Sequence, residues 1–301
     1  MQCINNFDGL LAHLKADKSH RVRVAVVCPH DEHTQEAIEA AITEDFADFL
    51  LIGRRESMGP VANIDEVNYL EEPDGDAAAA LAVKSVREGR ADVVMKGLVN
   101  TDNLLRAILN KEHGLLPPGN VLSHVTASEI PGHHKLLLYS DVAVIPSPTL
   151  EQRVAIIGYV ADVCRALGIE QPRIALMHFT EKINPKFPIT LDYVEIKKMA
   201  AEGRFGNAIV DGPMDIKTAC DAESGTIKGI ESPIGGNADA VIVSDIQAGN
   251  ILYKTLTGFC HATNAAMLVG ATAPVVLPSR SDSVRSKLCS LALACLSVNN
   301  R

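Results

Sequence analysis

The chain has 301 residues, of which 47% are hydrophobic, and it carries a formal net charge of −9. This length is compatible with one large unit or with two domains, and the acidic balance argues against nucleic acid as the main partner, because that partner requires a concentrated basic surface. No run of Lys and Arg exceeds two residues, and residues 1–14 lack the pattern of a signal peptide. No apolar run reaches the roughly 18 residues that cross a bilayer, so no membrane partner is expected.

The seven cysteines form no C-x-x-C pair, and several lie in apolar segments, among them Cys28 and Cys164. This pattern predicts reduced, mostly packed thiols in a cytoplasm rather than a disulfide framework.

Strand-like and helix-like segments alternate along the chain. In the first half the pattern predicts strands at 22–28, 49–52 and 92–95 and helices at 32–42, 75–88 and 101–110. In the second half it predicts helices at 150–167, 191–201 and 248–260 and strands at 173–177, 208–210, 240–243 and 265–269. The alternation indicates an α/β protein whose mostly parallel sheets carry helices on both faces.

A Pro-rich break at Pro146 and Pro148 lies near the middle of the chain, where the polypeptide can pass from one domain to another. The last strand and helix can then return to the first domain. We therefore expect two α/β domains, the first formed by residues 1–146 and 273–301 and the second by residues 147–272.

Ligands of open α/β sheets collect beyond the carboxyl ends of the strands. After the strand at 92–95, Lys96, Gly97 and Asn100 precede a helix, which is the pattern of an anion cradle, although Lys96 can also be a surface lysine. Further along, Ser123 and His124 bring a hydroxyl and an imidazole into a weakly patterned stretch that is useful for a site but not diagnostic.

Two strand ends in the second half carry carboxylates. Asp211 precedes Gly212 and Pro213, which force a turn, and Asp211 either caps that turn or takes part in catalysis. Asp245 follows the strand at 240–243. It is followed by Gly249 and Asn250, where a helical glycine indicates close approach of a ligand or of another helix.

The segment 273–283 is the most informative of these strand ends. It reads as a buried strand that ends at Ser279 and Arg280, directly before a helix with apolar residues on one face. Ser281, Asp282 and Ser283 are all possible caps of that helix. The free N–H groups of its first turn and the planar fork of Arg280 suit the oxygens of a phosphate.

The glycine signatures of dinucleotide and nucleoside-triphosphate sites are missing. His30, Asp31 and His33 open a helix, so we interpret Asp31 as its cap and expect no metal.

Taken together, these motifs resemble the phosphate acetyltransferase/phosphate butyryltransferase family, and most closely its butyryltransferase branch. The resemblance is carried, in order, by the segments Val94–Thr101, Asn110–Glu112, Leu122–His124, Val210–Pro213, Asp245–Lys254 and Pro274–Arg280. It implies transfer of an acyl group between coenzyme A and inorganic phosphate in a ternary complex, with acyl-CoA as a substrate and no tightly bound cofactor. It also implies an isocitrate/isopropylmalate dehydrogenase-like architecture with the active site in the interdomain cleft, and a homodimer or larger assembly.

The resemblance and the chemistry together assign roles at the last strand end. Arg280 is expected to hold phosphate with help from Lys96, and Ser279 Oγ is expected to stabilise the tetrahedral oxyanion. In the acetyltransferase branch an aspartate seven residues after the serine handles the thiol proton, but that position is Ser286 here. Asp245 and Asp282 share the prediction for this step, with Asp211 as a further candidate.

Two alternatives belong to other function classes. The same architecture serves metal- and NAD-dependent dehydrogenases of phosphorylated hydroxy acids, which require a ligand set that the sequence does not suggest. The other alternative is a non-catalytic acyl-CoA-binding protein. The preference for butyryl or a similar short acyl group comes from the family branch alone.

Overall fold

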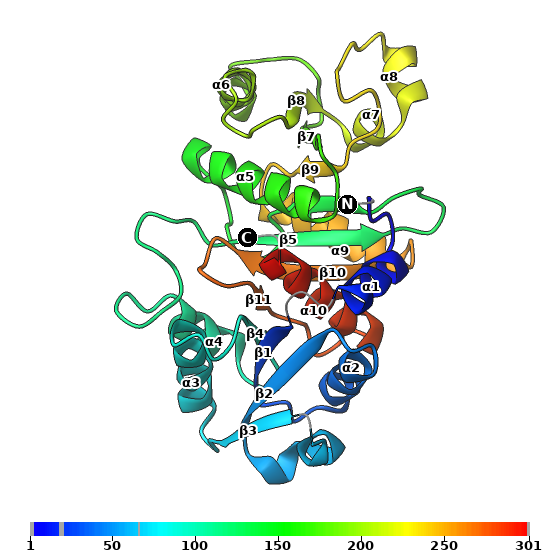
Figure 1. Ribbon diagram of the computed structural model, residues 1–301. Coiled ribbons are helices and arrows are strands. Elements are labelled where there is room, and N and C mark those ends of the chain that lie inside the picture. The colour runs from blue at the N-terminus through cyan, green and yellow to red at the C-terminus, as the bar shows by residue number, and fades with distance from the viewer. Residues whose placement is uncertain (1–2, 18–20, 66, 300–301) are drawn as a thin grey trace. The chain divides into compact units, whose positions relative to one another are not determined.

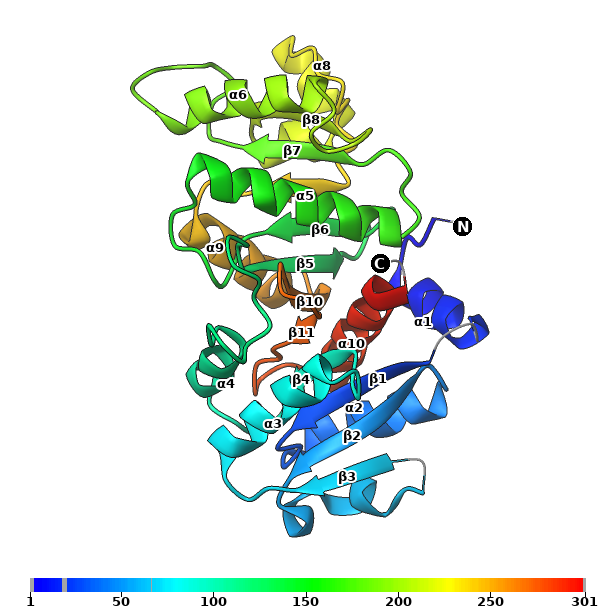
Figure 2. The same cartoon turned by 60° about the vertical axis from the view of Figure 1, so that its left-hand side comes forward.

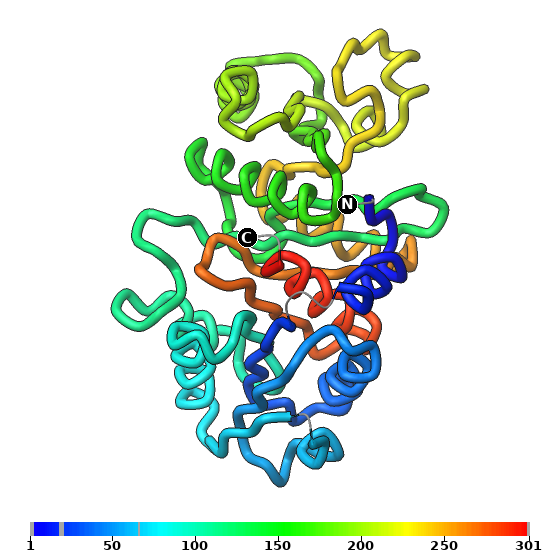
Figure 3. Tube along the Cα trace, viewed as in Figure 1, coloured from blue at the N-terminus to red at the C-terminus, as the bar shows by residue number. Residues whose placement is uncertain are grey.

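The computed structural model describes residues 3–17, 21–65 and 67–299, which form an α/β protein with mostly parallel strands (Figure 1). The chain divides into two compact units. Unit 2 comprises Phe7–Leu122 and Thr263–Arg301, and unit 1 comprises Ser123–Ala262 with the described residues of Met1–Asn6. Figure 3 traces this order by colour, since both ends of the bar belong largely to unit 2 and its middle to unit 1.

The strands of unit 2 run in the order β3-β2-β1-β4-β11-β10. These strands are β1 (Val22–Val27), β2 (Ala47–Gly53), β3 (Val67–Glu71), β4 (Val93–Lys96), β10 (Thr263–Val269) and β11 (Val275–Val276). All neighbours are parallel except β10 and β11. The buried residues of β1 and β4 form nearly continuous apolar runs, as expected for parallel strands covered on both faces.

Helices cover both faces of these strands (Figure 1). They are α1 (Phe7–Ala16), α2 (Glu32–Thr43), α3 (Gly75–Arg87), α4 (Thr101–Ile108) and α10 (Val284–Asn299), with short 3₁₀ turns at Arg55–Ser57 and Gly59–Asn63. α10 packs on α1, α2 and β10, whereas α3 packs on α4 and β1.

Unit 1 has the strand order β5-β6-β9-β7-β8. Its strands are β5 (Ser123–Glu129), β6 (Leu137–Ser140), β7 (Arg173–Met177), β8 (Ile209–Met214) and β9 (Ala240–Ile242). Its helices are α5 (Leu150–Ala166), α6 (Ile189–Ala201), α7 (Ile216–Cys220), α8 (Ala222–Lys228) and α9 (Ile246–Gly258). Only β5 runs antiparallel to its neighbour among these pairs, and α5 and α9 lie on opposite faces (Figure 2).

The predicted α/β alternation is confirmed, but three local interpretations are wrong. The weakly patterned stretch around Ser123 is the buried strand β5. Asp211, Gly212 and Pro213 do not turn into a helix, because β8 continues through them to Met214 and Asp215 is the residue that caps α7. The terminal helix α10 is buried on all sides from Lys287 to Leu296, not on one face only, because α1, α2 and β10 all pack against it.

The elements that were not predicted from sequence include α1, β3, β5 and α8. The chain passes from unit 2 to unit 1 at Ser123 and returns to unit 2 at Thr263. The predicted domain boundaries lie at residues 146/147 and 272/273, and the predicted two-domain division stays a prediction. In the described part of the chain no helix is both long and apolar enough to cross a membrane. All seven cysteines are free, and four of them, Cys28, Cys164, Cys289 and Cys295, are buried.

Candidate active site

Three neighbouring parallel strands of unit 2 end at one edge of the sheet. β4 pairs with β1 on one side and with β11 on the other. The loops that leave these strands lead to the first residues of α2, α4 and α10. Asp31 caps α2 and Asn100 caps α4, while Ser283 Oγ accepts from the N–H of Ser286 in the first turn of α10. Three helix N-termini thus follow adjoining strand ends. Their positive dipole ends favour binding of an anion at this edge of the sheet.

Lys96 brings a buried ammonium group to this edge. Its residue is 4% exposed, and its Nζ donates to the Gly97 carbonyl at 3.2 Å. Burial lowers the pKa of Lys96, and the positive charges of Arg280 and Lys287 lower it further, while the nearby carboxylates of Asp31 and Asp282 act in the opposite direction. We call Lys96, Arg280 and Lys287 the basic cluster. An ammonium has three donors, so Lys96 retains donors for an oxyanion.

The turn at residues 279–282 presents Ser279 and Arg280. Asp282 Oδ2 accepts from the Ser279 N–H at 2.7 Å, and the Asp282 N–H donates to the Ser279 carbonyl at 3.1 Å. The hydroxyls of Ser279 and Ser281 lie 3.0 Å apart. Arg280 is exposed and has no hydrogen bond or ion pair to another residue of the described ranges. The guanidinium is therefore available to a ligand, while Asp282 holds the turn that carries it.

Lys287 and its partner Asp31 were not predicted as site residues. Lys287, whose side chain is 2% exposed, donates from Nζ to Asp31 Oδ1 at 2.8 Å and to Thr34 Oγ1 at 2.9 Å. Burial raises the pKa of Asp31, but the hydrogen bonds from Lys287 and Thr34 outweigh it and hold that pKa below its ordinary value. One feature of the sequence could have indicated this site. Lys287 is a charged residue in the first turn of a helix that is otherwise rich in apolar residues.

Gly97 has a packing role in the structure. A Cβ at this position would lie 2.3 Å from the carbonyl oxygen of Cys28. The N–H of Leu98 donates to the same carbonyl at 2.6 Å, so the loops after β1 and β4 are pressed together. The backbone of the loop after β1 therefore approaches Gly97 closely.

In unit 1, Ser123 and His124 belong to a buried network around Asp141, which sequence reasoning missed. Asp141 Oδ2 accepts from Ser123 Oγ at 2.9 Å and from the His124 N–H at 3.3 Å, and its Oδ1 accepts from the N–H groups of Ala143 and Val144. Burial lowers the pKa of His124, which the charge of Asp141 opposes. The network fixes the connection from β6 to α5, so these side chains have structural partners.

Asp211 also has partners within unit 1. It is buried in β8, where Lys197 Nζ lies 2.5 Å from its Oδ1 and Ser232 Oγ donates to its Oδ2 at 2.6 Å. Gly212 packs against the Leu176 carbonyl, 2.6 Å from where its Cβ would lie. Pro213 follows in the same strand and is buried.

Asp245 caps α9. Its Oδ1 accepts from the N–H groups of Gln247 and Ala248 at 2.9 and 3.0 Å, and its Oδ2 accepts from Ser244 Oγ at 3.0 Å. Gly249 lets this helix approach the Asp141 backbone, since its Cβ would lie 2.3 Å from that carbonyl oxygen. Asn250 Nδ2 lies 3.5 Å from the Val142 carbonyl.

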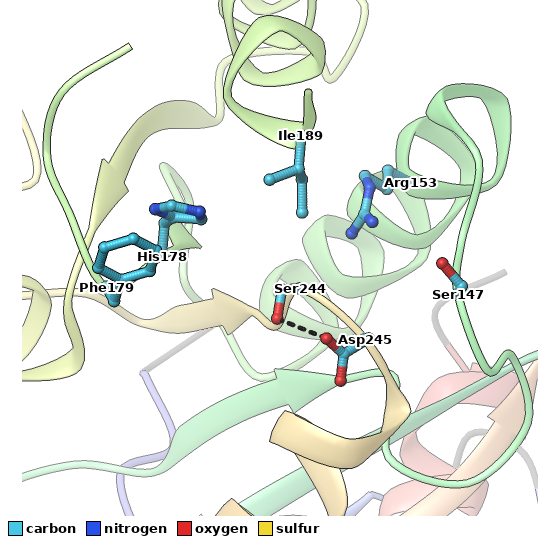
Figure 4. Close-up of a pocket in the computed structure, with 7 residues that line it drawn as sticks. All are labelled: Ser147, Arg153, His178, Phe179, Ile189, Ser244 and Asp245. Carbon is cyan, nitrogen blue, oxygen red and sulfur yellow. Dashed lines mark hydrogen bonds between the residues drawn. The ribbon is translucent and has the colours of Figure 1, made fainter. Parts of the chain in front are cut away.

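Asp245 also lines a pocket of about 440 Å³, which is drawn in Figure 4. The other residues that line it are Ser147, Arg153, His178, Phe179, Ile189 and Ser244. The pocket lies at the carboxyl ends of β7 and β9, and all of its residues belong to unit 1.

The predicted site residues therefore fall into two groups. Those of unit 2 are Lys96, Gly97, Asn100, Ser279, Arg280 and Asp282, and those of unit 1 are Ser123, His124, Asp211, Gly212, Pro213, Asp245, Gly249 and Asn250. The unit 2 group combines two cationic side chains and a serine hydroxyl beside helix N-termini, which can hold a tetrahedral oxyanion. Most side chains of the unit 1 group have hydrogen-bond partners within the protein.

Comparison with known proteins gives consistent matches. A family model described as phosphate acetyl/butaryl transferase matches residues 64–295. Phosphate butyryltransferase of Clostridium acetobutylicum is 38% identical over 99% of this chain and 100% of its own length. Phosphate acetyltransferase of Thermotoga maritima is 36% identical over 90% of this chain and 94% of its own length. The crystal structure of a branched-chain phosphotransacylase from Enterococcus faecalis V583 has 32% identity and a TM-score of 0.83, and covers 92% of this chain and 99% of its own.

Proposed function

Because this chain belongs to the phosphate acetyl/butyryl transferase family and is an acyltransferase of the phosphotransacylase kind, we propose that it transfers a short acyl group, butyryl or similar, between coenzyme A and inorganic phosphate. The observation that carries the phosphate side of this proposal is the basic cluster, which lies beside three helix N-termini in unit 2. The dehydrogenase alternative is not favoured, because the relatives carry the names of phosphotransacylases.

Arg280 and Lys96 hold phosphate in this mechanism. The guanidinium supplies a planar pair of donors and the buried ammonium supplies a point charge, and both act at helix N-termini that favour the same anion. A phosphate oxygen then attacks the thioester carbonyl directly, in a ternary complex. Holding the two reactants in line can supply about 7–11 kcal/mol of the barrier.

Ser279 and Asp282 serve the later steps. As the C–O bond forms, Ser279 Oγ donates to the tetrahedral oxyanion. Asp282 accepts the proton that phosphate gives up. When the C–S bond breaks, Asp282 donates this proton to the departing thiolate. We choose Asp282 over Asp245 because Asp282 lies in the same turn as Ser279 and Arg280, whereas both oxygens of Asp245 accept hydrogen bonds at the start of α9.

The proposal is tested by thiol release from acetyl-, propionyl-, butyryl- and isobutyryl-CoA, with and without phosphate or arsenate. Release that depends on the oxyanion, and is fastest with a four-carbon acyl group, is the expected result. Release without any oxyanion would identify a thioesterase, and binding without release would identify an acyl-CoA-binding protein.

Variants of the turn at residues 279–282 test the roles proposed for Arg280 and Ser279. Arg280→Lys is expected to lower kcat/KM for phosphate by at least about 100-fold, because a point charge does not replace the bidentate fork. Ser279→Ala is expected to lower kcat by about 100-fold or more with little change in the KM for phosphate. Arg204→Gln is the matched control, since Arg204 is an exposed arginine of unit 1, and it is expected to keep the parent rates.

We further propose that the protein forms a homodimer through unit 1. Of the ten exposed large apolar side chains among the described residues, eight belong to unit 1, including Phe179, Ile216 and Ile251. These three line a largely apolar groove of about 350 Å³ beside α9. A second copy of the chain can cover such a face symmetrically, which is the commonest arrangement among soluble oligomers.

A further inference from the structure

Arg153, in the first turn of α5, is a buried cation without a matching anion. The residue is 4% exposed, and its Nη1 makes a long hydrogen bond of 3.4 Å to the Val243 carbonyl. Its Nε is buried and has no hydrogen-bond partner, and the structure records no ion pair for the side chain within the described ranges. Because a guanidinium stays charged, burial without a partner costs free energy that a ligand could recover.

The guanidinium faces the pocket of about 440 Å³ over β7 and β9 (Figure 4). The figure shows it projecting from α5 toward Ile189 and Ser244, with His178 and Phe179 across the space. A pocket of this volume suits a small molecule. Hydroxyl groups of Ser147 and Ser244 can add hydrogen bonds, and the rings and alkyl groups form an apolar wall.

The charges around this pocket leave the guanidinium without close compensation. Burial lowers the pKa of Arg153, and electrostatic interactions with Tyr193, Asp192 and Asp245 oppose that effect. Asp245 is the carboxylate that lines the pocket, but its two oxygens accept hydrogen bonds from the start of α9 and from Ser244. The N-terminus of α5 adds a further positive end beside Arg153. The guanidinium therefore keeps a charge that no carboxylate of the described ranges pairs with directly, and an anion in the pocket can supply that pair.

We propose that this pocket binds a small organic anion, with a carboxylate or phosphoryl oxygen on the Arg153 guanidinium and a short apolar portion against Phe179 and Ile189. All of the contacts come from unit 1, and binding requires neither coenzyme A nor turnover. The test of this proposal is therefore independent of the test of the acyl-transfer activity.

The test is thermal unfolding of the full chain with butyrate, monobutyl phosphate or n-butanol, the last of which lacks the anion. The Arg280→Gln variant is the background, so that binding at the basic cluster is weakened. We expect butyrate or monobutyl phosphate to raise Tm by about 2 °C at ten times Kd, and n-butanol to leave it unchanged. The more effective anion names the head group. Arg153→Met, added to this background, abolishes the shift, while the matched surface change Arg204→Gln keeps it.

A structural role for Arg153 predicts a different result. If Arg153 only stabilises unit 1, Arg153→Met lowers the Tm without ligand and neither anion shifts the Tm of the background protein. If the pocket is a ligand site, the Tm of Arg153→Met without ligand equals or exceeds that of its parent, because an unpaired buried charge has been removed. Should Arg153→Met fail to fold, Ser147→Trp blocks the pocket from an exposed loop position and must abolish the shift. A shift that persists in either variant overturns the proposal.

Discussion

At the scale of single residues, several glycines matter because backbone atoms approach them. Gly249 in α9 faces the Asp141 carbonyl, whereas Gly158 in α5 has nothing within 4 Å of the position its Cβ would take. We predict that Gly249→Ala lowers the free energy of unfolding by about 1–3 kcal/mol through overpacking. Gly158→Ala is expected to raise it by about 0.5–1 kcal/mol, because alanine favours the helix.

Urea denaturation of the two variants and the parent measures this difference. The same substitution in two helices of unit 1 then changes stability in opposite directions. Equal effects at both positions would contradict the packing explanation.

The buried charge of Lys96 lowers the free energy of unfolding, and bound phosphate can offset this loss. The pKa of Lys96 lies below the ordinary value of 10.5, so its charge disfavours the folded state at neutral pH. This penalty decreases as pH rises above the lowered folded pKa and is absent above 10.5. We predict that Lys96→Met has an equal or higher free energy of unfolding at pH 7 in phosphate-free buffer. Added phosphate is expected to stabilise the parent and not the variant.

Denaturation at pH 7 with and without phosphate decides this prediction. A loss of more than about 1 kcal/mol in phosphate-free buffer would show that Lys96 is a structural residue instead. A phosphate effect that survives in Lys96→Met would remove it from the anion site.

At the scale of elements, the pair of Lys287 and Asp31 joins the first turn of α10 to the cap of α2. Asp31 has a pKa below its ordinary value of 3.8, so its contribution to stability is present above that pH and is lost as pH falls through the lower folded pKa. Asp31→Asn leaves the buried Lys287 charge unbalanced. We expect it to cost about 3 kcal/mol at pH 7.

The pH dependence separates this pair from a general effect of acid. Between about pH 4 and pH 2 the parent is expected to lose stability more steeply than Asp31→Asn, because the variant has already lost the ion pair. Asp162→Asn, a change of an exposed carboxylate on α5, serves as the control and should keep the pH profile of the parent. Parallel profiles for the parent and Asp31→Asn would refute the assignment.

At the scale of the whole molecule, the exposed apolar residues of unit 1 predict self-association. Ile251 on α9 is 67% exposed and Phe179 after β7 is 71% exposed. We expect sedimentation at micromolar concentration to give a dimer, and a double change of Ile251 and Phe179 to Glu to give a monomer that keeps its secondary structure. A parent that sediments as a monomer would reject this interface.

The sequence alone determined the α/β class, the order of most elements and the family, since these depend on local periodicity and on motifs that survive in linear order. It also identified Asp31 as a helix cap and the turn with Ser279 and Arg280 as the main site candidate. These are local features, and a cap depends on the few residues that follow it.

Only the tertiary structure decided which polar residues have partners. Asp141 engages Ser123 and His124 through pairings of β5 and β6, and Lys287 meets Asp31 across 256 positions of sequence. Gly97 and Gly249 have their roles because distant backbone segments touch them. The unpartnered guanidinium of Arg153 was likewise invisible in the sequence, because burial and hydrogen bonding of a side chain are set by residues that are remote along the chain.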